Sequence, residues 1–138
     1  MPKARSAQNA RRHGLSRLEI PVSDIDALTR NILAEVPSAL DHLAAADLAS
    51  AARDLAEAEL RLGRIARYMT ALETRALADL LAGDLDAGLA RLAVRRRLLR
   101  YRNAARRAQM KALQEWATMR HACTNPSLAP GVLGERHG

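Results

Sequence analysis

The segment that decides the fold is residues 48–72, LASAARDLAEAELRLGRIARYMTAL, in which a large apolar side chain recurs at every seventh position. The repeat consists of Leu48, Leu55, Leu62 and Met69, with Ala51, Ala58, Ile65 and Leu72 between them. Such a heptad repeat is typical of an α-helix that packs along a partner helix. Because residues 39–82 contain no Pro and one Gly, we expect a single long helix there.

The sequence that follows predicts a tight turn and a second long helix. Ala82-Gly83-Asp84-Leu85 combines a glycine suited to a helix C-terminus with the start of a new helix, which should run from Leu85 to about His121. Two long helices joined by so short a turn must lie antiparallel. We therefore predict an all-α fold, in which a short helix precedes a long, coiled-coil-like antiparallel hairpin.

The flanking segments complete the predicted organisation. Ser23 should cap a short helix over residues 24–36, which Pro37 ends, and Ser38 can cap the long helix that follows. Three regions result: a basic N-terminal arm over residues 1–20, a helical hairpin domain over residues 21–122, and a disordered C-terminal tail over residues 123–138. Within the arm, a short helix is expected from Ser6 to Gly14.

The composition limits the kind of core that this chain can build. Of 138 residues 49% are apolar, but only 2% are aromatic and Phe is absent, so the core must consist mainly of Leu and Ala. Such a core favours long helices that are stabilised by neighbours or copies. Cys123 is the only cysteine, which excludes an internal disulfide and fits a cytoplasmic location. No apolar run approaches the roughly 18 residues of a membrane span.

The second long helix carries two apolar stripes on nearly opposite sides. One consists of Leu85, Leu89, Leu92, Leu99, Met110 and Leu113, and the other of Val94, Leu98, Tyr101, Trp116 and Met119. One stripe can face the hairpin partner, which leaves the other for the first helix or for self-association. We predict a homo-oligomer, most simply a dimer that forms a four-helix bundle; the alternative is a monomeric three-helix bundle.

The basic residues are concentrated in residues 91–111, which hold nine cations and no carboxylate in a chain of net charge +7. Eight of them form two rows with the same spacing, Arg96, Arg100, Arg107 and Lys111 in one and Arg91, Arg95, Arg102 and Arg106 in the other. Each row stays on one helix face over roughly 22 Å. The opposing residues 56–76 are themselves net positive, so ion pairs within the hairpin cannot neutralise the segment.

This pattern predicts contact with the phosphate backbone of DNA or RNA, with help from Lys3, Arg5, Arg11 and Arg12 of the arm. The near absence of aromatic residues argues against recognition of single strands by base stacking. One alternative is a non-enzymatic structural or adaptor protein whose arginines meet an acidic protein partner. Another is a charged face that only meets solvent. A GC-rich bacterial genome alone can produce the preference for Arg over Lys, so the arginines need not indicate a partner.

The arm also carries a family resemblance. Its sequence KARSAQNARRHGLS, Lys3 to Ser16, resembles the KARSxxNAxxHGL motif near the N-terminus of many uncharacterised bacterial helical proteins. The resemblance implies a helical region after the arm and no particular activity. Within the motif, Asn9 and His13 share a helix face and can contact phosphate or bases, or can cap and turn the chain locally. The architecture is also similar to that of phage-type small terminase subunits, which implies a role in DNA packaging.

An enzymatic function is not expected from this sequence. The four histidines are scattered, and His121 with Cys123 provides at most two metal ligands. Acid–base pairs can be drawn between Asp54 and Glu57 or Glu73, but these residues lie on solvent faces without a pocket. Gly-rich phosphate loops and nucleophile motifs are absent. We therefore expect neither a catalytic residue nor a cofactor nor a bound metal, and we expect no association with a membrane, because the basic face lacks a bulky apolar flank.

Overall fold

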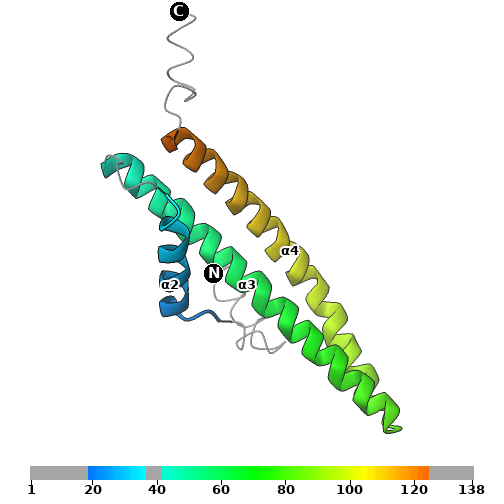
Figure 1. Cartoon of the computed structure of the whole chain (residues 1–138). Coiled ribbons are helices and arrows are strands. Elements are labelled where there is room, and N and C mark those ends of the chain that lie inside the picture. Colours follow the sequence, from blue (N-terminus) through cyan, green and yellow to red (C-terminus); the bar gives the residue numbers. More distant parts are fainter. Residues whose placement is uncertain (1–18, 37–41, 125–138) are drawn as a thin grey trace, which may run out of the picture. The chain divides into compact units, whose positions relative to one another are not determined.

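The computed structural model describes residues 19–36 and 42–124, which form three helices and contain no strand (Figure 1). These helices are α2 (Val22–Leu33), α3 (His42–Leu81) and α4 (Leu85–Thr124). The predicted all-α fold, with a short helix before a long antiparallel hairpin, is confirmed. The arm with its expected helix, the capping residue Ser38 and the C-terminal tail lie outside the described residues, so the predicted boundaries of arm, domain and tail stay a prediction.

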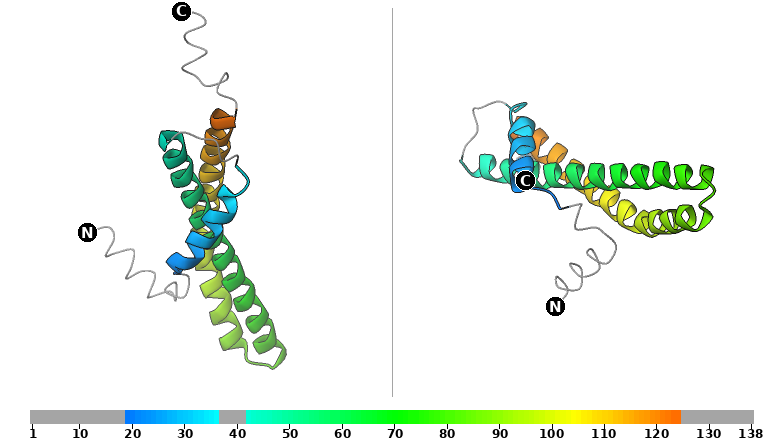
Figure 2. Two further views of the ribbon diagram at one scale, coloured as in Figure 1. Left: turned by 60° about the vertical axis from the view of Figure 1, so that its left-hand side comes forward. Right: turned by 90° about the horizontal axis from the view of Figure 1, so that it is seen from below.

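The turn between α3 and α4 lies where the sequence predicts it (Figure 2). Gly83 has a positive φ of 86°, a conformation that costs glycine little because it has no Cβ. The Asp84 N–H donates to the Asp79 carbonyl over 2.8 Å and so satisfies one free carbonyl at the end of α3. The Asp84 carboxylate accepts a hydrogen bond of 3.1 Å from the Ala87 N–H and thereby caps α4.

The described residues divide into two compact units. We call residues 19–20 and 59–107 the basic unit, and residues 21–36, 42–58 and 108–124 the acidic unit. The basic unit contains the turn and the adjoining halves of α3 and α4. The acidic unit contains α2 and the remaining halves of the two long helices.

Each unit has its own apolar core along the seam between α3 and α4. The core cluster of the basic unit contains the buried residues Ile65, Met69, Leu72, Leu98 and Ala105, and that of the acidic unit contains Leu48, Ala51, Ala52, Leu55, Ala112 and Trp116. The predicted heptad seam of α3 is thus confirmed. On α4, the stripe with Leu98 and Trp116 faces α3, whereas Leu85 and Leu89 of the other stripe stay exposed.

The start and end of α2 differ from the prediction. The helix begins at Val22 with Pro21 as its N-cap, and no side chain caps it, so the predicted capping role of Ser23 is wrong. Proline suits this position because its ring fixes φ near the helical value, and the Pro21 carbonyl accepts from the N–H groups of Asp24 and Ile25. The helix ends at Leu33 and continues as a turn to Val36.

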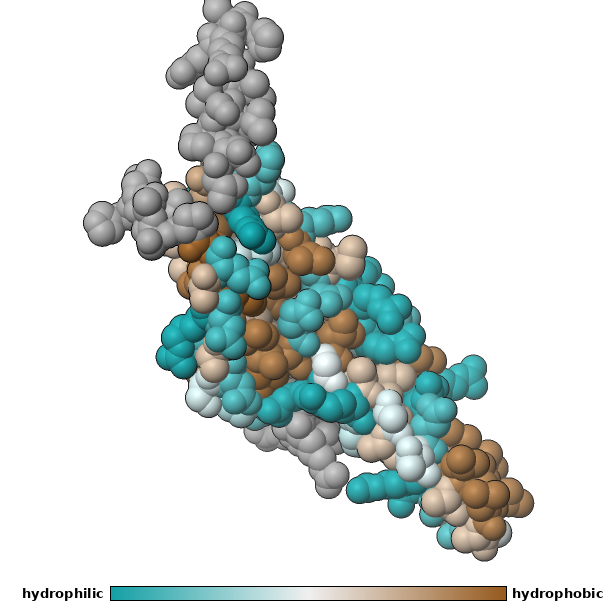
Figure 3. All heavy atoms as spheres, in the orientation of Figure 1, coloured by the Kyte–Doolittle hydropathy of each residue, from teal (hydrophilic) through white to brown (hydrophobic). Residues whose placement is uncertain are grey.

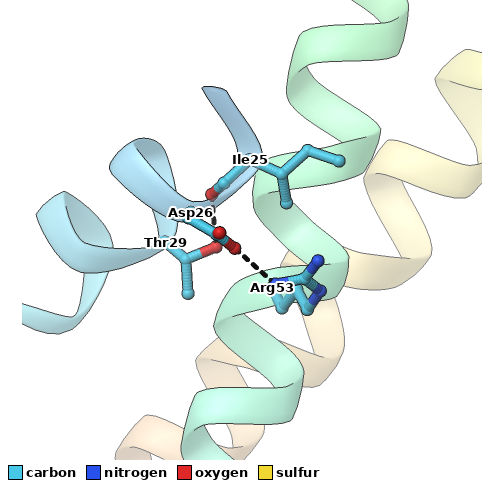
Figure 4. A network of polar contacts seen from close by, with 4 residues as sticks. All are labelled: Ile25, Asp26, Thr29 and Arg53. Carbon is cyan, nitrogen blue, oxygen red and sulfur yellow. Dashed lines mark hydrogen bonds and ion pairs between the residues drawn. The ribbon is translucent and has the colours of Figure 1, made fainter. Parts of the chain in front are cut away.

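An ion pair joins α2 to α3 within the acidic unit. Asp26 of α2 pairs with Arg53 of α3 over 2.6 Å, and the Thr29 hydroxyl donates to the Ile25 carbonyl one turn earlier (Figure 4). Both charged side chains are about half exposed, so the pair adds little to stability. Burial of Ile25 and the packing of Ile32 and Leu33 on the acidic unit's core are therefore the main reasons that α2 docks.

Candidate functional site

The two units carry opposite charge, which locates the basicity of the protein. The described residues of the basic unit hold twelve arginines and six carboxylates, whereas those of the acidic unit hold four cations and seven carboxylates. An excess of six positive charges within about 50 residues creates a positive potential that attracts anions. The arginines of α4 in the basic unit are therefore the main candidates for an anion-binding site.

Three of these arginines lie along the seam, and we call them the inner arginines: Arg91, Arg95 and Arg102. All three are half-buried. The Arg91 Nε lies 2.7 Å from the Asp79 carboxylate, and the Arg95 Nε lies 3.3 Å from the Glu73 carboxylate. The Arg95 contact satisfies the distance of an ion pair but lacks hydrogen-bond geometry, and the buried Nε of Arg102 also has no hydrogen-bond partner. Arg91 and Arg95 thus help to hold α4 against α3.

Five further arginines of the same segment are exposed, and we call them the outer arginines: Arg96, Arg97, Arg100, Arg106 and Arg107. Within the described part of the chain, no ion pair joins them to a carboxylate. Their positive charges are therefore balanced only by solvent ions, which an anionic partner can displace. The ion pairs that cross the hairpin from this segment thus involve Arg91 and Arg95 and leave the outer arginines available.

Arg97 is a candidate that the spacing rules missed. It belongs to neither of the two predicted rows, yet it is exposed and lines an open hollow on α4 together with Ala93, Arg96, Arg100 and Tyr101. The Arg100 guanidinium lies 5.5 Å from the centre of the Tyr101 ring. The three consecutive arginines at positions 95–97 indicate such a residue in the sequence. Neighbouring residues on a helix point about 100° apart, so the two rows can include two of the three, and the third must point in another direction.

Lys111 ends one predicted row but lies in different surroundings. It is exposed in the acidic unit and lines an open groove with Asp47, Asp54 and Glu115. Three carboxylates around one ammonium group reduce its attraction for phosphate. Of the predicted site residues, the structure therefore groups Arg96, Arg100, Arg106 and Arg107 as exposed cations of one unit, and Lys111 belongs to the other.

The remaining candidates from the sequence are not brought into this surface. Lys3, Arg5, Arg11 and Arg12, like the motif residues Asn9 and His13, lie outside the described residues. In residues 19–36 and 42–124, no three or more metal-binding side chains come together. None of the helices in these ranges is both long and apolar enough to cross a bilayer.

Comparison with known proteins adds no relative: no family model, no curated protein and no solved structure matches this chain. The resemblance of the arm to the KARSxxNAxxHGL proteins and the architectural similarity to small terminase subunits stay predictions. The candidate site accordingly rests on the geometry and charge of the basic unit.

Proposed function

We propose that this protein binds the phosphate backbone of DNA or RNA through the outer arginines of α4. The observation that supports the proposal is that five exposed arginines of one helix have no carboxylate partner within the described residues, on a unit with twice as many arginines as carboxylates. The protein acts as a binding module without enzymatic activity, in the cytoplasm, which its single cysteine favours.

The spacing of the outer arginines suits a duplex. Arg96 and Arg107 are eleven residues apart, which is about 16 Å along an α-helix, and double-stranded DNA carries one charge per roughly 1.7 Å of its axis. Several phosphates therefore come within reach of the row at once. Tyr101 is the only aromatic residue at the surface described, so binding rests on the backbone rather than on base stacking. The cations of the arm add contacts of the same kind.

The proposal is tested by fluorescence anisotropy with a mixed-sequence duplex at several salt concentrations. We expect affinity to fall as salt rises, with a log–log slope of about −4 if all five outer arginines contact phosphate. The R106A/R107A variant should lower the steepness of this slope by about two, because two phosphate contacts are lost. Arg67 and Arg75 provide the matched control, since they are exposed arginines of α3 in the same unit.

The control separates a localised surface from general basicity. R67A/R75A removes the same charge, so it should change the slope much less than R106A/R107A does. Equal effects of the two variants would contradict a site on α4. If the wild-type protein does not bind the duplex at low salt, the nucleic-acid proposal is wrong, and an acidic protein becomes the partner that the same arginines fit.

A further inference from the structure

The side of α4 that faces away from α3 carries a row of exposed residues at steps of three and four, which are Leu85, Leu89, Ala93, Arg96 and Arg100. This face lies opposite Leu98 and Ala105, which are buried against α3. Leu85 and Leu89 are 62% and 58% exposed, and Figure 3 shows hydrophobic side chains gathered at the end of the hairpin where α3 and α4 are joined.

A hollow lies on the same helix beside these leucines. It is lined by Ala93, Arg96, Arg97, Arg100 and Tyr101. The methyl group of Ala93, the Tyr101 ring and the hydrocarbon stems of the arginines give it an apolar lining, whereas the guanidinium groups can reach solvent at its rim. The middle of the hollow is about eight residues beyond Leu89, which is about 12 Å along the helix. One basic unit thus presents both an exposed apolar side chain and a recess that can hold one.

The charges around the leucines determine which partner fits. Residues 76–90 contain Asp79, Asp84 and Asp86 and no cation. This end of the hairpin is therefore unsuited to an anionic membrane or to phosphate. A few turns further along α4, Arg96, Arg97 and Arg100 are exposed. The face is acidic and apolar at one end and basic at the other, so its best complement is the same face in the opposite direction.

We propose that two copies of this chain associate through this face of α4, antiparallel about a two-fold axis near Ala93. In this arrangement Leu89 of each copy enters the hollow of the other copy. Leu89 lies four residues before Ala93, and the middle of the hollow lies four residues after it, so the two-fold axis brings them together. Asp86 of each copy lies beside the partner's Arg100, since both are seven residues from Ala93. The small side chain of Ala93 allows the two helices to approach closely at the axis. Such an interface is closed and limits the assembly to a dimer.

Three of the outer arginines, Arg96, Arg97 and Arg100, lie in this interface. In the dimer Arg106 and Arg107 of each copy lie beyond the overlap of the two α4 helices and stay available to phosphate. The association is measured without nucleic acid, so it is tested separately from the proposed function. The two proposals can therefore fail separately: loss of duplex binding leaves the dimer unaffected, and a monomeric protein can still bind a duplex.

The first test is sedimentation equilibrium of the full chain over a range of protein concentrations. Wild-type protein should sediment as a monomer–dimer mixture or as a dimer. Leu89→Lys should raise the dissociation constant at least about tenfold, because it places a positive charge beside the arginines that line the hollow. Leu77→Lys is the matched control, because Leu77 is also 58% exposed but belongs to α3. Circular dichroism shows whether both variants keep their helices.

The second test exchanges the proposed ion pair. Asp86→Arg and Arg100→Asp should each weaken the dimer, since each places like charges together, and the double variant should restore it. The proposal is overturned by a protein that is monomeric at every concentration, by equal effects of Leu89→Lys and Leu77→Lys, or by a double variant that dimerises as weakly as the single ones. In those cases another partner or another face is involved.

Discussion

Three glycines lie in the hairpin, and they have different reasons to be there. A Cβ on Gly88 would lie 2.7 Å from both Cγ and Cδ2 of Leu80 and 3.1 Å from the Ala76 carbonyl oxygen. At this position α4 approaches α3 too closely for a side chain. Gly63 lies within α3, and nothing is within 4 Å of where its Cβ would be. Gly83 has equally open surroundings, but its positive φ makes any side chain there strained.

Alanine substitutions at Gly63 and Gly88 should therefore act in opposite directions. Gly63→Ala should raise the free energy of unfolding by about 0.5–1 kcal/mol, because alanine loses less conformational freedom in a helix. Gly88→Ala has the same helical gain but introduces overpacking that costs about 1–3 kcal/mol, so it should lower the free energy of unfolding. Urea denaturation followed by circular dichroism measures both. Stabilisation by Gly88→Ala would mean that the helices separate easily at this point.

At the scale of the helix, α4 depends on the face that it turns to α3. Leu98 is fully buried in the basic unit, whereas Leu113, on the other stripe, is 41% exposed. Leu98→Ala should cost about 2–5 kcal/mol, because it removes apolar contacts and leaves a cavity. Leu113→Ala should change stability by about 0.5 kcal/mol or less, as most surface substitutions do. The two variants are compared by urea denaturation, and equal losses would contradict the assignment of the stripes.

The heptads of α3 and the turn at Gly83 could be predicted from the sequence because they depend on local spacing and on backbone conformation. The choice between the two stripes of α4 could not, because both have similar numbers of large apolar residues. The structure buries the stripe in which Ala105 and Ala112 lie between Leu98 and Trp116. Small residues allow the two helix backbones to approach each other closely. The two stripes were defined by large apolar side chains alone, so the contribution of Ala105 and Ala112 was not considered.

For the candidate site, the sequence predicts where the cations are concentrated but not which of them pair with carboxylates and which stay exposed. The concentration of cations in residues 91–111 is visible in the sequence, whereas the pairing of Arg91 with Asp79 depends on which residues the hairpin places opposite each other. The same contact decides that Arg91 leans toward α3. Arg97 was missed because the prediction considered only cations that recur at a regular spacing, and Arg97 belongs to neither of the two regular rows. Ser23 was wrongly predicted as the cap because an acid in the first turn, such as Asp24, fits a helix that follows Ser23 as well as one that follows Pro21.

At the scale of the whole molecule, a net charge of +7 results from a basic unit and an acidic unit of opposite sign. A polyanion is attracted by the first and repelled by the second. The repulsion acts over a Debye length of about 30 Å at 0.01 M salt but only about 3 Å at 1 M. The carboxylates of Asp47 and Asp54 lie in the groove beside Lys111, so they both repel phosphate and reduce the attraction that Lys111 exerts.

D47N/D54N should therefore bind a duplex more tightly than the wild-type protein at low salt, by several-fold, because the variant gains two units of net charge and leaves only Glu115 of the three carboxylates beside Lys111. The difference should shrink as salt is raised, since screening removes the long-range repulsion first. Ser50→Ala with Thr118→Ala is the matched control, because both residues line the same groove without charge. Anisotropy titrations of the three proteins measure the effect. If D47N/D54N and the wild-type protein bind equally at low salt, the acidic unit lies beyond the reach of the bound phosphates, and the outer arginines alone determine the affinity.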